Sequence, residues 1–152
     1  MAKQRNSPVS KQYDSVAVAG RILIGVLFLM SGLSKIAAPA ATQGYIASVG
    51  LPAPVAAYAV AVAVEVLGSA LLIAGVRTRF VAAGMAVFTL ATALTFHKNF
   101  ADQNQMIHFM KNISIMGGLL QVVAFGGGRF SVDRLLARRS VASADATLQP
   151  VH

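Results

Sequence analysis

Four charged residues lie inside long apolar stretches of this chain, and their chemistry depends on how those stretches are placed. Arg21 and Lys35 lie near the two ends of the first stretch, Glu65 lies near the centre of the second, and Lys111 lies in the fourth. An ionisable side chain inside a membrane span costs about 2.5–3.5 kcal/mol on insertion scales, so it usually faces the protein interior and has a partner. A guanidinium binds a carboxylate through two parallel hydrogen bonds and can cover the axial gap, so we expect a buried ion pair between Arg21 and Glu65.

A second group of polar residues near the ends of the same stretches predicts a cationic pocket at the outer membrane interface. Such a pocket, with apolar walls, could bind an anion or the polar head of a quinone. The alternatives are that the lysines simply reach the lipid headgroups and that the histidines are ordinary loop residues. The two histidines are eleven positions apart, which is no known ligand spacing, so we expect no metal site. The members of this candidate outer pocket are Lys35, His97, Lys98, His108, Lys111 and Asn112.

Glycines accompany these charges at helical spacing. Gly25 and Gly32 lie on the same helical line as the two cations of the first stretch, and Gly68 and Gly118 lie on the charged faces of the second and fourth. Small residues at such positions allow helices to pack closely in membranes. We therefore expect these four glycines to mark helix-packing faces.

The elements that must position these residues are predicted to be four transmembrane helices. The chain of 152 residues is 56% hydrophobic and only 12% charged, whereas soluble domains carry about 25% charged residues. Each apolar stretch has about 17–23 residues, the length that a helix needs to cross about 30 Å of hydrocarbon. The expected spans are 16–38, 54–76, 80–97 and 107–125, within one four-span domain over residues 16–136. The predicted fold class is an all-α, four-helix transmembrane bundle.

Composition also predicts the segments outside the spans. We expect residues 1–15 to form a cytoplasmic N-terminal segment and residues 137–152 to form a disordered cytoplasmic tail. Loop 39–53 is neither apolar enough to span nor charged, and it predicts either a short interfacial helix or a re-entrant turn. The basic N-terminus before an apolar run also resembles a cleavable secretory signal, but Lys35, just before the supposed cleavage site, disfavours that alternative.

The distribution of lysine and arginine predicts the orientation. Nine of these residues lie in the N-terminal segment, the 76–79 turn and the segment after the last span, whereas only Lys98 lies in the other two loops. Positive charge concentrates on the cytoplasmic side of a membrane, so both termini are predicted to lie inside. The net charge of +8 then mainly sets the orientation in the membrane. We therefore expect the lipid bilayer, and not nucleic acid, to be the partner of these basic residues. The chain has no cysteine, which excludes disulfides and thiol chemistry.

Several motifs occur in an order that is typical of one family. The spacing Arg21-x3-Gly-x2-Phe-x3-Gly-x2-Lys35 is followed by Glu65, by Arg77-Thr-Arg79, by Phe109-Met-Lys111-Asn112-Ile-Ser-Ile-Met-Gly-Gly118 and by Gly128-Arg-Phe-Ser-Val-Asp133. Over about residues 16–136 this arrangement resembles the DoxX family of small membrane proteins, and within it the YphA type of bacterial inner membrane protein. The resemblance implies a four-helix membrane fold and an inner-membrane location. It also implies a link to quinone and redox complexes such as thiosulfate:quinone oxidoreductases.

We therefore expect a small inner-membrane protein that serves as an accessory or binding subunit linked to a quinone or a redox partner. That partner is a redox protein or a second copy of the chain. The lack of a recognisable catalytic group disfavours an enzyme, but a quinone-linked oxidoreductase of the thiosulfate:quinone type, with His97 or Glu65 handling protons, remains an alternative. A small-solute or proton carrier is a further alternative. The absence of interrupted helices and of an inverted repeat in the sequence argues against it.

Overall fold

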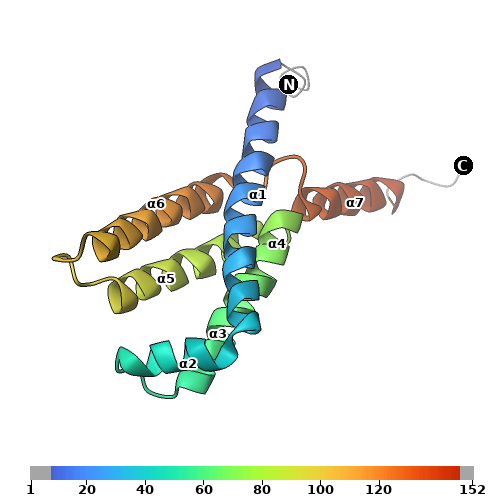
Figure 1. The fold of residues 1–152 in the computed structure, drawn as a ribbon. Coiled ribbons are helices and arrows are strands. Elements are labelled where there is room, and N and C mark those ends of the chain that lie inside the picture. The colour runs from blue at the N-terminus through green and yellow to red at the C-terminus, as the bar shows by residue number, and fades with distance from the viewer. Residues whose placement is uncertain (1–7, 148–152) are drawn as a thin grey trace, which may run out of the picture.

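The computed structural model describes residues 8–147, with the side chains of residues 13–140, and this part of the chain is helical without strands. One helix, α1, runs through the first span, and the second span consists of three consecutive segments of which the middle one is a π-helical turn, η2 (Figure 1). The elements in chain order are α1 (Pro8–Ala37), α2 (Pro39–Ser48), α3 (Pro54–Ala63), η2 (Val64–Gly68), α4 (Ser69–Ala74), α5 (Thr78–Phe96), α6 (Gln103–Phe125) and α7 (Val132–Thr147).

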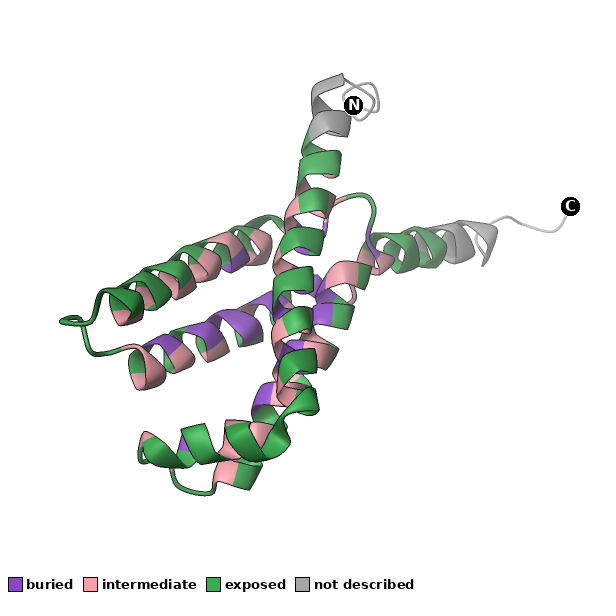
Figure 2. Cartoon of the chain, in the orientation of Figure 1, coloured by how far each residue is buried: buried purple, intermediate pink, exposed green. Residues whose placement is uncertain are grey.

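Four of the helical stretches are long and apolar enough to cross a membrane, namely Tyr13–Ala37, Pro54–Ala74, Thr78–Phe96 and Gln103–Phe125. They overlap the four expected spans, with ends that differ by up to four residues, and confirm the all-α, four-span fold class. Large apolar side chains cover their outer surfaces, which Figure 2 shows as exposed over most of the chain. Such a continuous apolar surface is what lipid, and not water, accommodates.

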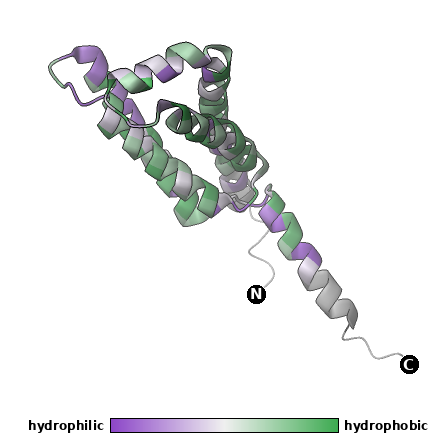
Figure 3. Cartoon of the chain, turned by 90° about the horizontal axis from the view of Figure 1, so that it is seen from below, coloured by the Kyte–Doolittle hydropathy of each residue, from purple (hydrophilic) through white to green (hydrophobic). Residues whose placement is uncertain are grey.

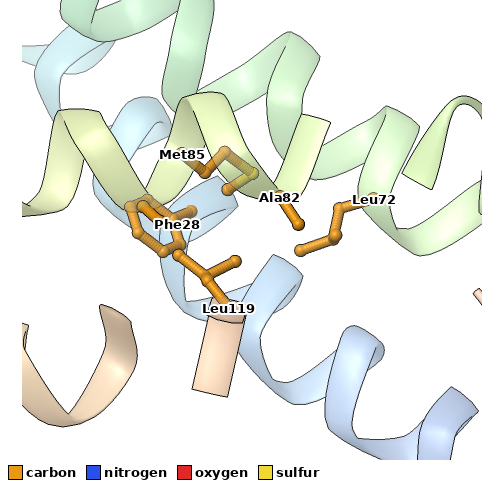
Figure 4. Close-up of a cluster of buried hydrophobic side chains, with 6 residues drawn as sticks. Phe28, Leu72, Ala82, Met85 and Leu119 are labelled. Atoms are coloured by element: carbon orange, nitrogen blue, oxygen red, sulfur yellow. The ribbon is translucent and has the colours of Figure 1, made fainter. Parts of the chain in front are cut away.

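The spans form two pairs that meet at one small core. Helix α1 lies along α3, η2 and α4, and α5 lies along α6 (Figure 1). Every span contributes to the core, in which side chains from the four elements point toward one another (Figure 4). The contributing residues are Phe28 of α1, Leu72 of α4, Ala82, Met85 and Ala86 of α5, and Leu119 of α6.

The chain brings three distant segments together at one end of the spans, which we call the basic end. Here the Arg129 main-chain N–H donates to Asp14 Oδ1 at 2.9 Å, and the Asp133 main-chain N–H donates to the Gly75 carbonyl at 3.0 Å. The start of α1, the α4–α5 turn and the α6–α7 loop therefore lie side by side. At the opposite end α2 reaches α5, because Tyr45 stacks on Phe96 at 5.4 Å between ring centroids. Hydrophilic residues gather at the α5–α6 turn and at the start of α7 (Figure 3).

Helix ends differ from the expected spans where the chain carries a cap. Helix α6 begins at Gln103, four residues before the expected start, because the Asp102 side chain accepts hydrogen bonds from the main-chain N–H groups of Asn104 at 2.8 Å and Gln105 at 3.3 Å. Loop 39–53 contains a regular helix, α2, with Pro39 in its first turn. This agrees with the helical alternative for that loop and not with a re-entrant turn.

The tail that composition predicts to be disordered from residue 137 instead continues as α7 to Thr147. The prediction was wrong for residues 137–147 because it overlooked the local helix signals. Ser131 Oγ accepts the main-chain N–H of Arg134 at 3.3 Å, as an N-cap does, and the following Leu, Ala and Arg residues have high helix propensity. Residues 148–152, and residues 1–7 of the N-terminal segment, lie outside the described part of the chain.

Candidate functional site

An ion pair between Lys35 and Glu65 lies inside the membrane-spanning segments. Lys35 Nζ donates to both carboxylate oxygens of Glu65, at 2.9 Å to Oε1 and 2.8 Å to Oε2, and to Ser31 Oγ at 2.8 Å. The Glu65 side chain is 7% exposed, whereas the Lys35 side chain is 26% exposed. The carboxylate is therefore enclosed and accepts two hydrogen bonds, whereas the ammonium group lies at the boundary of the enclosed region.

A widened helical turn presents the carboxylate. Glu65 lies in η2, and the Ser69 hydroxyl donates to the Glu65 main-chain carbonyl at the next turn. Single π-helical turns inside α-helices are rare and occur frequently at functional sites. Helix α1 approaches this turn closely, because a Cβ atom added to Gly32 would lie 2.7 Å from Val66 Cγ2 and 3.0 Å from Glu65 Cβ. The glycine thus allows the first span to lie directly against the turn that carries the acid.

The prediction of an ion pair between Arg21 and Glu65 is wrong, because Glu65 forms its ion pair with Lys35. Gly32 contacts the turn that carries Glu65, so the relative register of α1 and the second span can be read from this point. Lys35 is three residues beyond Gly32, about 4.5 Å along the axis, whereas Arg21 is eleven residues before it, about 16 Å away. The predicted Arg21–Glu65 pair requires the inner ends of the two spans to lie at the same level, but α1 begins at Pro8 and extends past the end of α4.

Arg21 is buried instead at the basic end, where it joins the second span to the α6–α7 loop. Its Nη1 donates to the carbonyls of Leu72 at 3.2 Å and Ile73 at 3.5 Å, and its Nη2 donates to the Phe130 carbonyl at 2.8 Å. The last carbonyls of a helix have no partner within the helix, and its C-terminal end attracts cations. Arg21, which is 1% exposed, therefore caps the C-terminal end of the second span and holds the loop against it.

Asp133 completes the same end of the molecule and was not singled out as a site residue from the sequence. Its carboxylate accepts the main-chain N–H groups of Arg77 at 2.6 Å and Thr78 at 2.8 Å, and the Thr78 hydroxyl at 2.7 Å. Burial raises the pKa of Asp133, but the hydrogen bonds from Thr78 and Arg77 and the charge of Arg21 together hold that pKa below its usual value. The sequence did carry a signal for this contact, because Asp133 and the 77–79 turn both belong to the motifs that resemble the DoxX family.

The candidate outer pocket is divided in the structure. Lys35 belongs to the Glu65 pair, whereas the two histidines stack on each other at 5.1 Å between ring centroids on the α5–α6 hairpin. His97 Nδ1 lies 3.2 Å from Gln105 Oε1, and Lys111 Nζ lies 3.1 Å from His108 Nδ1. The α5–α6 turn lies apart from the end of α1 that carries Lys35 (Figure 1). The remaining two expected members, Lys98 and Asn112, are exposed and half-buried respectively.

Of the two stacked histidines, His97 has a lowered pKa. Burial lowers the pKa of His97, the nearby charges of His108 and Lys111 lower it further, and the hydrogen bond with Gln105 opposes this shift. Within the described residues, no group of three or more His, Cys, Asp or Glu side chains is placed to hold a metal ion. The hairpin therefore presents a polar surface that favours neutral His97.

All four glycines expected at packing faces lie at helix contacts. An added Cβ would lie 2.5 Å from Ile73 Cγ1 at Gly25, 3.3 Å from the Met85 side chain at Gly68 and 3.2 Å from Ile24 Cδ1 at Gly118, besides the Gly32 contact described above. Of these four glycines, the two in α1, Gly25 and Gly32, have the least room for a side chain. These two contacts fix α1 against the second span and so bring Lys35 to Glu65.

The fold and the site define a class: a small, four-span helical membrane protein whose first two spans enclose a Lys–Glu pair at a π-helical turn. Residues 16–98 match the family model described as DoxX, and the chain belongs to the DoxX family, as its motifs had indicated.

Two relatives from Escherichia coli strain K12 cover most of the chain. The inner membrane protein YqjF is 37% identical over 131 residues, which is 86% of this chain and 99% of YqjF. The inner membrane protein YphA is 35% identical over 119 residues, which is 75% of this chain and 85% of YphA. No solved structure matches the chain. The chain is accordingly an inner membrane protein of the DoxX family.

Proposed function

We propose that this protein is an accessory subunit that binds the headgroup of a membrane quinone at the Lys35–Glu65 pair and presents it to a redox partner. The observation that carries the proposal is the pair itself. It is a complete ion pair inside the spans, and one member is enclosed while the other is a quarter exposed. Ionisable groups at such depth are costly to retain and commonly mark ligand or ion sites.

The pair offers the two kinds of hydrogen bond that a quinone needs in its two redox states. A quinone carbonyl is an acceptor, and it can replace the Ser31 hydroxyl as the acceptor of the third Lys35 N–H, which leaves the two bonds to Glu65 in place. A quinol hydroxyl is a donor, and an ionised carboxylate accepts it. The apolar surfaces of the spans accommodate the isoprenoid tail, as is usual for sites that combine apolar walls with few polar groups.

A binding role, and not catalysis, fits the contacts of the carboxylate. Both oxygens of Glu65 already accept hydrogen bonds from one ammonium group, so the carboxylate is held by a partner within its own chain. The sequence contains no cysteine that could carry a covalent or redox intermediate. Electron transfer is therefore assigned to the partner, and the chain supplies the quinone.

We further propose that both termini lie in the cytoplasm. The basic end contains the α4–α5 turn and the α6–α7 loop, with Arg77, Arg79 and Arg129, whereas the opposite end carries Lys98. The positive-inside rule then places the basic end in the cytoplasm and the Lys35–Glu65 pair in the outer half of the membrane.

The test is titration of the purified protein in lipid nanodiscs with a short-chain ubiquinone analogue. Wild type is expected to bind it saturably, and Glu65→Gln, which keeps the size of the side chain and removes its charge, is expected to weaken binding about tenfold or more. Lys111→Met is the matched control, because Lys111 is exposed and contacts His108. Equal affinity of wild type and Glu65→Gln would refute the assignment. Quinol turnover by the purified chain alone would instead identify an oxidoreductase.

A further inference from the structure

Two adjoining cavities lie at the basic end, and neither contains a residue of the Lys35–Glu65 pair. The larger, of about 580 Å³, is a groove between α1 and α6, and the smaller, of about 490 Å³, lies between the start of α1 and the α6–α7 segment. Asp14 lines both, so the two adjoin at this residue. The groove is walled by Val16, Ile24, Val122 and Phe125, with Gly20 and Gly118 between the walls.

The two cavities differ in chemistry. The walls of the groove are almost wholly apolar and belong to the spans Tyr13–Ala37 and Gln103–Phe125, so the groove lies at membrane depth. The smaller cavity carries two cations, Arg129 and Arg138, against one carboxylate, Asp14, which leaves a formal charge of +1. The main-chain N–H of Arg129 donates to Asp14, but among the described residues neither guanidinium forms a hydrogen bond or ion pair.

We propose that this composite site binds one anionic phospholipid of the phosphatidylglycerol type, which carries a single phosphodiester. The phosphate lies between the guanidinium groups of Arg129 and Arg138, which form charge-assisted hydrogen bonds with it, and one acyl chain lies in the groove between α1 and α6. The net charge of +1 matches the single negative charge of this headgroup. A groove volume of about 580 Å³ is in the range of sites that hold small ligands, about 300–1,000 Å³.

The headgroup half of the site is tested with a pair of charge-matched double variants. Native mass spectrometry of the full-length protein, released from mild detergent, counts bound phosphatidylglycerol and, in parallel, zwitterionic phosphatidylethanolamine. Arg129→Gln/Arg138→Gln is expected to weaken phosphatidylglycerol binding about thirtyfold. Arg77→Gln/Arg134→Gln, which removes the same charge outside the cavity, is expected to leave binding unchanged. Equal losses in the two double variants, or equal binding of the two lipids, would overturn the proposal.

The acyl half is tested by filling the groove. An added Cβ meets no atom within 4 Å at Gly20 or at Gly84, so a side chain can begin at either position without a backbone clash, but only Gly20 lines the groove. Gly20→Leu is expected to abolish retention of the lipid, and Gly84→Leu to preserve it. Soluble glycerol phosphate is expected to bind far more weakly than the lipid. Unchanged lipid binding by Gly20→Leu, equal binding of glycerol phosphate, or a Gly20→Leu variant that alters only the oligomeric state would each contradict the lipid assignment.

Discussion

The two members of the Lys35–Glu65 pair are expected to differ in what their removal does to stability, because they differ in exposure. Lys35→Met leaves a carboxylate that is 7% exposed and has lost its counter-ion. Glu65→Leu leaves an ammonium group that is 26% exposed, in the last turn of α1. A lysine in this position can extend its long side chain to the membrane surface, whereas a glutamate in η2 cannot.

The magnitudes follow from this asymmetry. Removing one partner of a buried ion pair destabilises a protein by about 3–5 kcal/mol, and Lys35→Met is expected in the upper part of this range. Glu65→Leu is expected to destabilise by about 1–2 kcal/mol, since a charge near the interface costs less than one at the membrane centre. The double variant Lys35→Met/Glu65→Leu places two apolar side chains together and is expected to be as stable as wild type, or more stable by about 1–4 kcal/mol.

The assay is reversible unfolding in detergent micelles with increasing dodecyl sulfate, followed by the loss of helical circular dichroism. The four proteins form a double-mutant cycle, in which the coupling free energy is expected to exceed about 4 kcal/mol. Lys111→Met serves as the exposed control and is expected to stay within about 0.5 kcal/mol of wild type. Additive single effects, or a larger loss from Glu65→Leu than from Lys35→Met, would refute the reasoning.

Three other features give separate expectations. Gly25→Ala is expected to destabilise by about 1–3 kcal/mol, since its Cβ would lie 2.5 Å from Ile73 Cγ1, whereas Gly20→Ala, with open space around it, is expected to be neutral or stabilising in the same unfolding assay. Because the pKa of Asp133 is lowered in the fold, its contribution to stability is present above about pH 4 and is lost as the pH falls through the folded-state pKa. The unfolding midpoint of wild type should therefore fall over this acid range, and that of Asp133→Asn should not show this fall. For topology, cysteines introduced at Ser48 and Ser140 of this cysteine-free chain are expected to react with an impermeant maleimide from the periplasmic side only at residue 48.

The sequence predicts the spans well because their signal is length and apolarity, which do not depend on tertiary contacts. The ends were less predictable where one side chain decides them. Asp102 extends α6 by a turn through a cap that lies in a polar loop, and Ser131 starts α7, which continues into the segment 137–147 that composition alone marks as disordered. Both caps are local, and a Ser or Asp directly before helix-forming residues is the sequence signal that marks them.

The partner of Glu65 could not be predicted, because it depends on how two helices are displaced along their axes. Periodicity places Arg21 and Lys35 on one face of α1, but it does not give the level at which that face meets the second span. Gly25 and Gly32 set that level through contacts with side chains of the neighbouring span. The π-helical turn at Glu65 adds a further displacement that no pattern in the sequence marks.

The most direct test of the proposed quinone site is to locate the ligand on the chain. A photoreactive quinone analogue is cross-linked to the protein in native membranes, and the labelled peptide is identified by mass spectrometry. We predict labelling near the end of α1, at residues 31–35, and in η2, at residues 64–68, with competition by unlabelled quinone and loss in Lys35→Met/Glu65→Leu. Labelling confined to the α5–α6 turn or to the α1–α6 groove, or labelling that this double variant retains, would contradict the assignment of the ion pair as the quinone site.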